Sequence, residues 1–140
     1  MAKILIVDDD GAVQATIRLL LERAGHSVVL ANDGCKALAT VESGNFDLVF
    51  LDIFMPGMDG LETMKLIHRQ HPRLPVIVIS GNHAGSASGP DLLGKATGLG
   101  AVTTLRKPFK PAALLAAVAE SLETAAAAPR RPDRAARNVV

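Results

Sequence analysis

Short apolar runs alternate with segments of helical periodicity along most of this chain. Runs rich in apolar and β-branched residues, without a polar residue at every second position, are typical of strands covered on both faces. The chain has five such runs, which are Ile4 to Val7, Ser27 to Ala31, Asp47 to Asp52, Val76 to Ser80 and Ala101 to Leu105. We therefore expect five buried strands.

Apolar residues recur at every third or fourth position between these runs, which predicts helices. The first helix carries Val13, Ile17 and Leu21 on its apolar face and should end at Gly25. Four more are expected: one between the turn at 32–34 and the stop at 43–45, one from near Gly60 to near Pro72, a short one over 91–99, and one from Pro111. The alanines at 125–128 can extend the last helix until Pro129 breaks it.

The alternation of strands and helices predicts an α/β fold. Such chains form a parallel sheet with helices on both faces and right-handed crossovers. We expect the flavodoxin-like (βα)5 three-layer sandwich, in which the strand order is 2-1-3-4-5. In that order the carboxyl ends of the first, third, fourth and fifth strands meet in one cleft.

Polar side chains stand at those four strand ends. Asp8 and Asp9 follow the first strand, Asp52 ends the third, Ser80 ends the fourth and Lys107 follows the fifth. Three converging carboxylates repel one another unless they are protonated or bind a cation, and a set of oxygen ligands suits Mg²⁺. Carboxylate, Mg²⁺, lysine and hydroxyl together indicate a phosphoryl-acceptor site, in which Asp52 attacks phosphorus.

Each of these residues has an ordinary interpretation when it is taken singly. An aspartate after a strand is usually a turn former or a helix N-cap, and we expect only that role for Asp10 and Asp59. A lysine before a proline is usually solvated, but four such residues at successive strand ends are hard to explain by coincidence. No histidine shows metal-ligand spacing, so surface or capping roles are expected for His26, His68, His71 and His83.

Charge and composition divide the chain into a body and a tail. Residues 125–140 hold four arginines and one aspartate, a net charge of +3, while the other 124 residues carry 11 basic and 13 acidic side chains, a net charge of −2. We expect one domain over 1–124 and a disordered basic tail over 125–140. The mildly acidic body does not suggest a nucleic-acid surface.

The expected location is the cytoplasm. A single cysteine, Cys35, cannot form an internal disulfide, which fits a reducing compartment. The first apolar run reaches Asp8 too early for a signal peptide, and no apolar run approaches the length of a membrane span.

Four motifs in this order resemble the receiver domain of bacterial two-component response regulators. They read ILIVDDD, LVFLDIFMPGMDG, VIVIS and LRKPF, and the resemblance covers Lys3 to about Thr124. It implies a CheY-like phosphoprotein that takes a phosphoryl group from a sensor histidine kinase or a phosphotransfer protein. Such a domain signals through a downstream protein partner, without direct nucleic-acid or membrane binding, and catalyses only its own phosphotransfer and autodephosphorylation.

The resemblance also implies a role for each site residue. Asp52 is similar to the phosphorylated aspartate, and Asp8 and Asp9 are similar to the acidic pair that binds Mg²⁺ together with Asp52. The backbone carbonyl of Phe54 is implied as a further Mg²⁺ ligand. Ser80 resembles the switch hydroxyl, and Lys107 the lysine that pairs with the phosphoryl group, with a cis peptide expected between residues 107 and 108. Gly81 matches a small residue that keeps the acceptor open.

The chain departs from the family pattern in three places. The switch aromatic usually lies three residues before the lysine, where this chain has Thr104. The interval from Ser80 to Lys107 is longer than usual and rich in glycine. Only the short basic tail follows the last helix, from which we expect a stand-alone receiver.

Three alternatives stay open at this point. A phosphatase with an aspartyl nucleophile usually needs a second acid two residues on, where this chain has Phe54. A flavin-binding electron carrier on the same fold would need a phosphate loop after the first strand, where Asp8, Asp9 and Asp10 would repel a phosphate. The third alternative is a pseudo-receiver scaffold that is never phosphorylated.

Overall fold

Strands and helices alternate through the parts of the chain that the structure describes. The computed structural model describes residues 2–52, 60–80, 103–107 and 109–127. The strands are β1 (Lys3–Val7), β2 (Ser27–Ala31), β3 (Leu48–Asp52), β4 (Val76–Ser80) and β5 (Thr103–Arg106). The helices are α1 (Gly11–Arg23), α2 (Gly34–Ser43), α3 (Gly60–Gln70) and α5 (Pro111–Ala127). Among these helices, none is long and apolar enough to cross a membrane.

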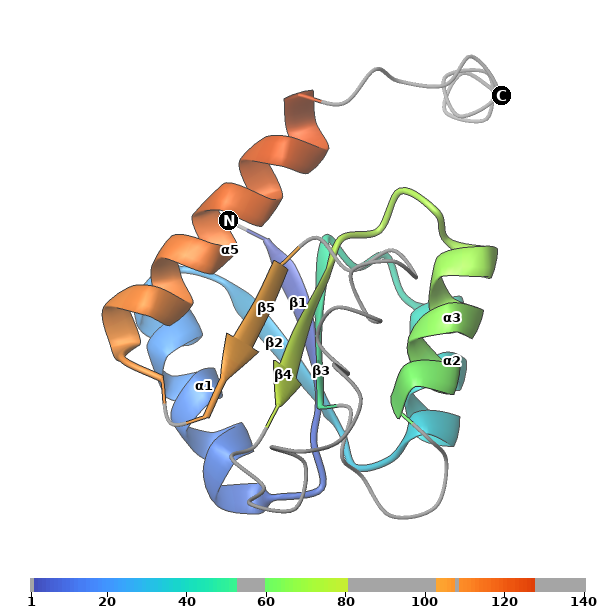
Figure 1. Ribbon diagram of the computed structural model, residues 1–140, viewed down its shortest axis with the longest axis horizontal. Helices are drawn as coiled ribbons and strands as arrows, with labels where there is room; N and C mark the ends of the chain where they lie inside the picture. Colours follow the sequence, from blue (N-terminus) through green and yellow to red (C-terminus); the bar gives the residue numbers. More distant parts are fainter. Residues whose placement is uncertain (1, 53–59, 81–102, 108, 128–140) are drawn as a thin grey trace, which may run out of the picture.

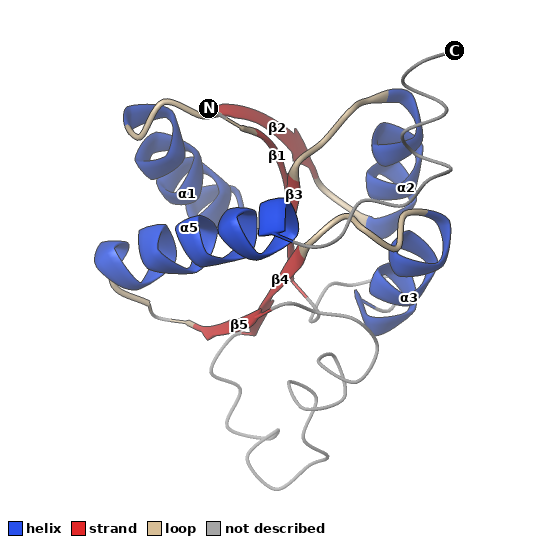
Figure 2. Cartoon of the chain, turned by 90° about the horizontal axis from the view of Figure 1, so that it is seen from above, coloured by secondary structure: helices blue, strands red, loops and turns tan. Residues whose placement is uncertain are grey.

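The five strands form one parallel sheet in the order β2-β1-β3-β4-β5. Helices α1 and α5 cover one face of this sheet, and α2 and α3 cover the other (Figures 1 and 2). The expected strand order and the flavodoxin-like three-layer sandwich are thereby confirmed. The helix expected over 91–99 lies outside the described residues.

The helices end close to where the sequence predicts. Asp10 caps α1, because its side chain accepts hydrogen bonds from the amides of Ala12 and Val13. At the other end of α1, Gly25 adopts a left-handed conformation with φ +95°, which glycine reaches at little cost. Helix α5 reaches Ala127, three residues beyond the domain boundary expected at 124. The rest of the expected tail, 128–140, is outside the described ranges, so the boundary stays a prediction.

Successive strand residues point to opposite faces of the sheet, and each face carries its own apolar core. Leu5, Val49 and Val78 pack on the α2 and α3 side, together with Met64 and Ile67. On the α1 and α5 side the strands contribute a second set of fully buried side chains: Ile4, Ile6, Phe50, Ile77 and Ile79. The burial of each of these apolar side chains contributes about 1.5–3 kcal/mol to the stability of the fold. Two filled cores hold the strands in one register and so fix where their carboxyl ends lie.

Candidate functional site

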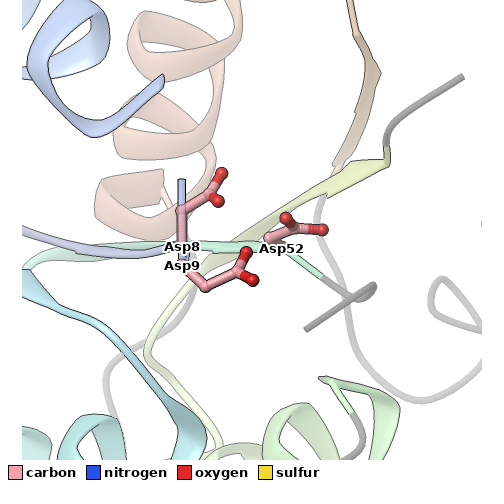
Figure 3. A group of neighbouring side chains, drawn as sticks. All are labelled: Asp8, Asp9 and Asp52. Atoms are coloured by element: carbon pink, nitrogen blue, oxygen red, sulfur yellow. The ribbon is translucent and has the colours of Figure 1, made fainter. Parts of the chain in front are cut away.

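Three carboxylates gather at the carboxyl edge of the sheet. Asp8 follows β1 directly, and Asp52 is the last residue of β3. Because Val7 on β1 pairs with Leu51 on β3, the two aspartates leave neighbouring strands at the same level. One oxygen from each of Asp8, Asp9 and Asp52 lies within 4.8 Å of the others (Figure 3).

The two aspartates after β1 differ in their surroundings. Asp8 is fully buried, and its Oδ1 accepts a hydrogen bond of 2.9 Å from the amide of Asp10. Asp9 is exposed to solvent. Asp52 is nearly as buried as Asp8, at 3% exposure. The cluster therefore has two buried carboxylates on its inner side and one on the solvent side.

Lys107 reaches the cluster from the end of β5, one of the two outermost strands of the sheet. Its Nζ donates to Asp8 Oδ2 at 3.0 Å and to Asp52 Oδ2 at 3.2 Å. The lysine directly follows β5, and β4 lies between β5 and β3, so the long side chain reaches across the end of β4. One ammonium thus binds carboxylates from two different strands, and its side chain is only 20% exposed.

Burial and pairing shift the proton affinities of this group. Burial raises the pKa of Asp8 above its ordinary value, against the opposing effect of its hydrogen bonds with Asp10 and Lys107. Burial alone would lower the pKa of Lys107, but its hydrogen bond to Asp8 and the nearby charge of Asp52 raise that pKa above the ordinary value. Lys107 is therefore charged at neutral pH. With all three aspartates ionised, these four side chains carry a formal charge of −2.

The donor set fits a hard divalent cation. All three acidic side chains offer oxygen atoms, and Mg²⁺ prefers oxygen ligands while it retains several of its waters. The exposed position of Asp9 leaves one side of the cluster next to solvent, which provides those waters. Asp8, Asp9 and Asp52 are thus the residues that could hold Mg²⁺.

The remaining site predictions concern residues that the structure places in part or not at all. Ser80 ends β4, and its backbone pairs in register with Arg106 at the same edge as Asp52. Thr104 lies within β5 and pairs with Val78. Phe54, Gly81 and the peptide between residues 107 and 108 fall outside the described residues. The roles expected for them stay predictions.

Gln14 belongs to the surroundings of the site and was not among the residues predicted from the sequence. It is 7% exposed, and its Nε2 donates to the carbonyl oxygens of Asp8 at 2.7 Å and Ala31 at 3.0 Å. Its spacing from Ile17 and Leu21 could have indicated that it is buried, since residues 14, 17 and 21 recur on one face of α1. A polar residue on that apolar face needs a buried partner.

The histidines take no part in the cluster as far as the structure describes them. His26 Nδ1 accepts a hydrogen bond of 3.0 Å from the amide of Ala2, at the opposite edge of the sheet. Within the described ranges, the only group of three or more potential metal ligands is the aspartate cluster. His83 is outside these ranges.

A family comparison agrees with this geometry. Residues 4–119 match the response regulator receiver domain family. The nitrogen assimilation regulatory protein NtrX of Azorhizobium caulinodans is 36% identical over 123 residues, which are 86% of this chain and 26% of that protein. The response regulator MprA of Mycobacterium leprae is 37% identical over 139 residues, covering 98% of this chain and 56% of MprA.

Solved structures share the fold at similar identity. The receiver domain of NtrX from Brucella abortus has a TM-score of 0.79 and 36% identity, covering 86% of this chain and 98% of that one. The chemotaxis protein CheY4 of Vibrio cholerae has a TM-score of 0.77 and 31% identity, covering 87% of this chain and 99% of that one.

The curated relatives are longer than this chain. It spans 26% of NtrX, 43% of the alkaline phosphatase synthesis transcriptional regulatory protein PhoP of Bacillus subtilis, and 56% of MprA. The likeness to these proteins therefore concerns only part of each, and for NtrX of Brucella abortus that part is the receiver domain, of which 98% is covered. This chain belongs to the response regulator receiver domain family of two-component systems.

Proposed function

We propose that this receiver domain accepts a phosphoryl group on Asp52 in a Mg²⁺-dependent reaction. The observation that carries the proposal is the contact of one ammonium, Lys107, with both Asp8 and Asp52 inside a cluster of three carboxylates. A nucleophilic carboxylate, a group of cation ligands and a fixed positive charge are the parts that phosphoryl transfer to an aspartate requires.

The transfer forms one bond and breaks another. A carboxylate oxygen of Asp52 attacks the phosphorus of a phosphohistidine on the donor protein. The phosphorus–nitrogen bond breaks, and the leaving imidazole takes up a proton from solvent. The product is an aspartyl phosphate on this chain and a neutral histidine on the donor.

The surrounding residues offset the charge of the incoming group. Lys107 already lies 3.2 Å from Asp52 Oδ2 and brings a positive charge to the phosphoryl oxygens. Asp8, Asp9 and Asp52 would hold Mg²⁺, with the carbonyl of Phe54 as a further ligand. When bound, this ion neutralises negative charge on the transferred group. Ser80, at the end of β4, supplies the hydroxyl that binds the phosphoryl group afterwards.

The partners follow from this chemistry. The phosphoryl donor is a sensor histidine kinase or a phosphotransfer protein, and the phosphorylated domain acts in the cytoplasm through altered contact with a downstream protein. The net charge of −2 on residues 1–124 supports protein contact over direct nucleic-acid binding by this domain. The domain turns over no separate substrate in this scheme. That the receiver acts alone remains a prediction.

Labelling with acetyl phosphate and Mg²⁺, followed by intact mass, tests the proposal. The wild-type protein should gain the mass of one phosphoryl group, and a chelator should prevent the gain. Asp52→Asn should abolish labelling, because the amide is not a nucleophile. Asp47→Asn is the matched control, since Asp47 is an exposed aspartate just before the same strand, and it should be labelled like the wild type. Full labelling of Asp52→Asn would refute the assignment.

A further inference from the structure

Gln14 is a buried polar residue on the inner face of α1. It is 7% exposed, and its neighbours on the same helical face, Ile17 and Leu21, are fully buried and apolar. A carboxamide in this position costs stability unless it is hydrogen-bonded. The bonds that it makes therefore show what the residue does in the fold.

The carboxamide of Gln14 connects the ends of two strands. Nε2 donates to the carbonyl of Asp8, after β1, at 2.7 Å and to the carbonyl of Ala31, at the end of β2, at 3.0 Å. A longer contact of 3.4 Å reaches Oδ1 of Asn32. Because both close partners are carbonyl oxygens, only the amino end of the carboxamide can face them, so its orientation is fixed by chemistry.

The bond to Asp8 acts on the peptide that leads into Asp9. A peptide unit is planar, so fixing the carbonyl oxygen of Asp8 also fixes the amide nitrogen and Cα of Asp9. Asp9 is exposed, and packing alone does little to orient its side chain. Other hydrogen bonds hold the backbone on either side of this peptide. The amide of Asp8 donates to the carbonyl oxygen of Ala31 at 3.2 Å, and the amide of Asp10 donates to Asp8 Oδ1 at 2.9 Å.

We propose that Gln14 is a positioning residue for the metal site: it ties the Asp8–Asp9 peptide to β2 and so directs the Asp9 carboxylate into the cluster. The inference rests on the proposed Mg²⁺ site and extends it to a residue that touches neither the ion nor the phosphoryl group. Groups that orient metal ligands typically change metal affinity by about 10–100-fold when they are removed.

Calorimetric titration of the whole chain with Mg²⁺ tests this role without reference to phosphorylation. Gln14→Met keeps the length of the side chain and removes both N–H donors. We expect its Kd for Mg²⁺ to rise about tenfold or more. The matched control is Ile17→Val, one turn further along the same buried face, which lowers the melting temperature but should leave the Kd within twofold of the wild type.

A second measurement uses the wild-type protein alone and does not depend on any variant folding. The chain has two glutamines, Gln14 and Gln70, and Gln70 is exposed at the end of α3. In an NMR titration with Mg²⁺, the side-chain NH₂ signals of Gln14 should shift together with the backbone amides of Asp9 and Asp10. Those of Gln70 should not move.

The possible results separate this inference from the proposed function. A Kd of Gln14→Met within twofold of the wild type, or Gln14 signals that stay fixed while the Asp9 amide shifts, would overturn the positioning role and leave the Mg²⁺ site intact. A wild-type protein that binds no Mg²⁺ would overturn both. An equal loss of affinity in Gln14→Met and Ile17→Val would attribute the effect to general stability and likewise refute the role.

Discussion

The amino ends of the strands form one edge of the sheet, the amino edge, and their carboxyl ends form the other, the carboxyl edge. Polar groups are paired differently at these two edges. At the amino edge, the amide of Lys3 donates to Asp47 Oδ2 at 2.9 Å, and the amide of Asp47 donates back to the carbonyl of Lys3 at 2.8 Å. The ammonium of Lys3 lies 4.9 Å from the centre of the Phe46 ring. At the carboxyl edge, Asp8 and Asp52 share the ammonium of Lys107.

The two edges therefore differ in how much charge they gather in one place. At the amino edge, Asp47 is exposed and its carboxylate accepts a hydrogen bond from a backbone amide. The carboxyl edge concentrates a formal charge of −2 in a place where two carboxylates are almost fully buried. Burying excess charge costs stability, and such a cost is typical of sites whose function depends on it. A cation supplied from solution can offset this cost.

The largest expected effect is that of Lys107→Met. This change leaves Asp8 and Asp52 buried without the ammonium, and the free energy of unfolding should fall by about 3 kcal/mol at neutral pH. Mg²⁺ should restore part of the loss. Urea denaturation with and without Mg²⁺ measures both effects.

The control for this change is Lys3→Met at the amino edge. It removes a cation that lies over an aromatic ring and should cost less than about 1 kcal/mol, without any response to Mg²⁺. Equal losses at the two lysines would contradict the contrast between the edges.

A smaller effect of opposite sign is expected for Asp8→Asn. Burial raises the pKa of Asp8, so its ionised form is less favourable in the folded protein than in the unfolded chain. Removing the charge should raise the free energy of unfolding by about 1 kcal/mol at pH 7. The Asn side chain keeps an oxygen for the amide of Asp10.

The pH dependence of this gain follows from the direction of the shift. A raised pKa means that the folded state binds more protons, so the wild type loses stability as the pH rises above the ordinary value of 3.8 and through the folded-state pKa. The advantage of Asp8→Asn should therefore shrink as the pH falls and vanish below 3.8, where Asp8 is protonated in the folded and the unfolded protein alike. A gain that persists unchanged at low pH would have another cause. Mg²⁺ affinity should be weaker in this variant at neutral pH.

The smallest effect is expected at His26 on the amino edge. Burial, and then the positive charge of the amino terminus, lowers the pKa of His26 below 6.5. The folded state then binds fewer protons, so its contribution to stability is present above pH 6.5 and is lost as the pH falls through the lowered pKa. Solvent screening keeps the loss below about 0.5 kcal/mol.

His26→Asn isolates this contribution. An asparagine Oδ1 can accept the hydrogen bond from the amide of Ala2 and does not titrate. The variant should therefore show a flatter pH dependence of thermal unfolding between pH 5 and roughly 7, the range in which histidine titrates. An identical slope in wild type and variant would show that His26 contributes nothing to it.

The sequence predicted the strands themselves, because the apolar runs end abruptly in charged residues, and the strand order followed from the fold class that the alternation of strands and helices indicates. Asp8, Asp52 and Lys107 stand at such ends, and a parallel sheet brings these ends together. The unequal burial of Asp8 and Asp9 was not predictable, since adjacent aspartates look alike until the direction of each side chain is known.

Gln14 was missed for a related reason. A single glutamine in an amphipathic helix is usually a surface residue, and only the three-dimensional position of two carbonyl oxygens shows why this one is buried. The contact of Lys107 with two strands also depends on how far its side chain extends across β4, which strand order alone does not specify.

The contacts of Lys107 also bear on the order in which the protein can assemble. The lysine is 99 residues from Asp8 and 55 from Asp52 along the chain. At about 5–20 residues per second, a ribosome adds the lysine several seconds after it has added the last of the three aspartates. The folded cluster therefore cannot gain its lysine until the chain has been synthesised past β5, which ends at Arg106, directly before Lys107.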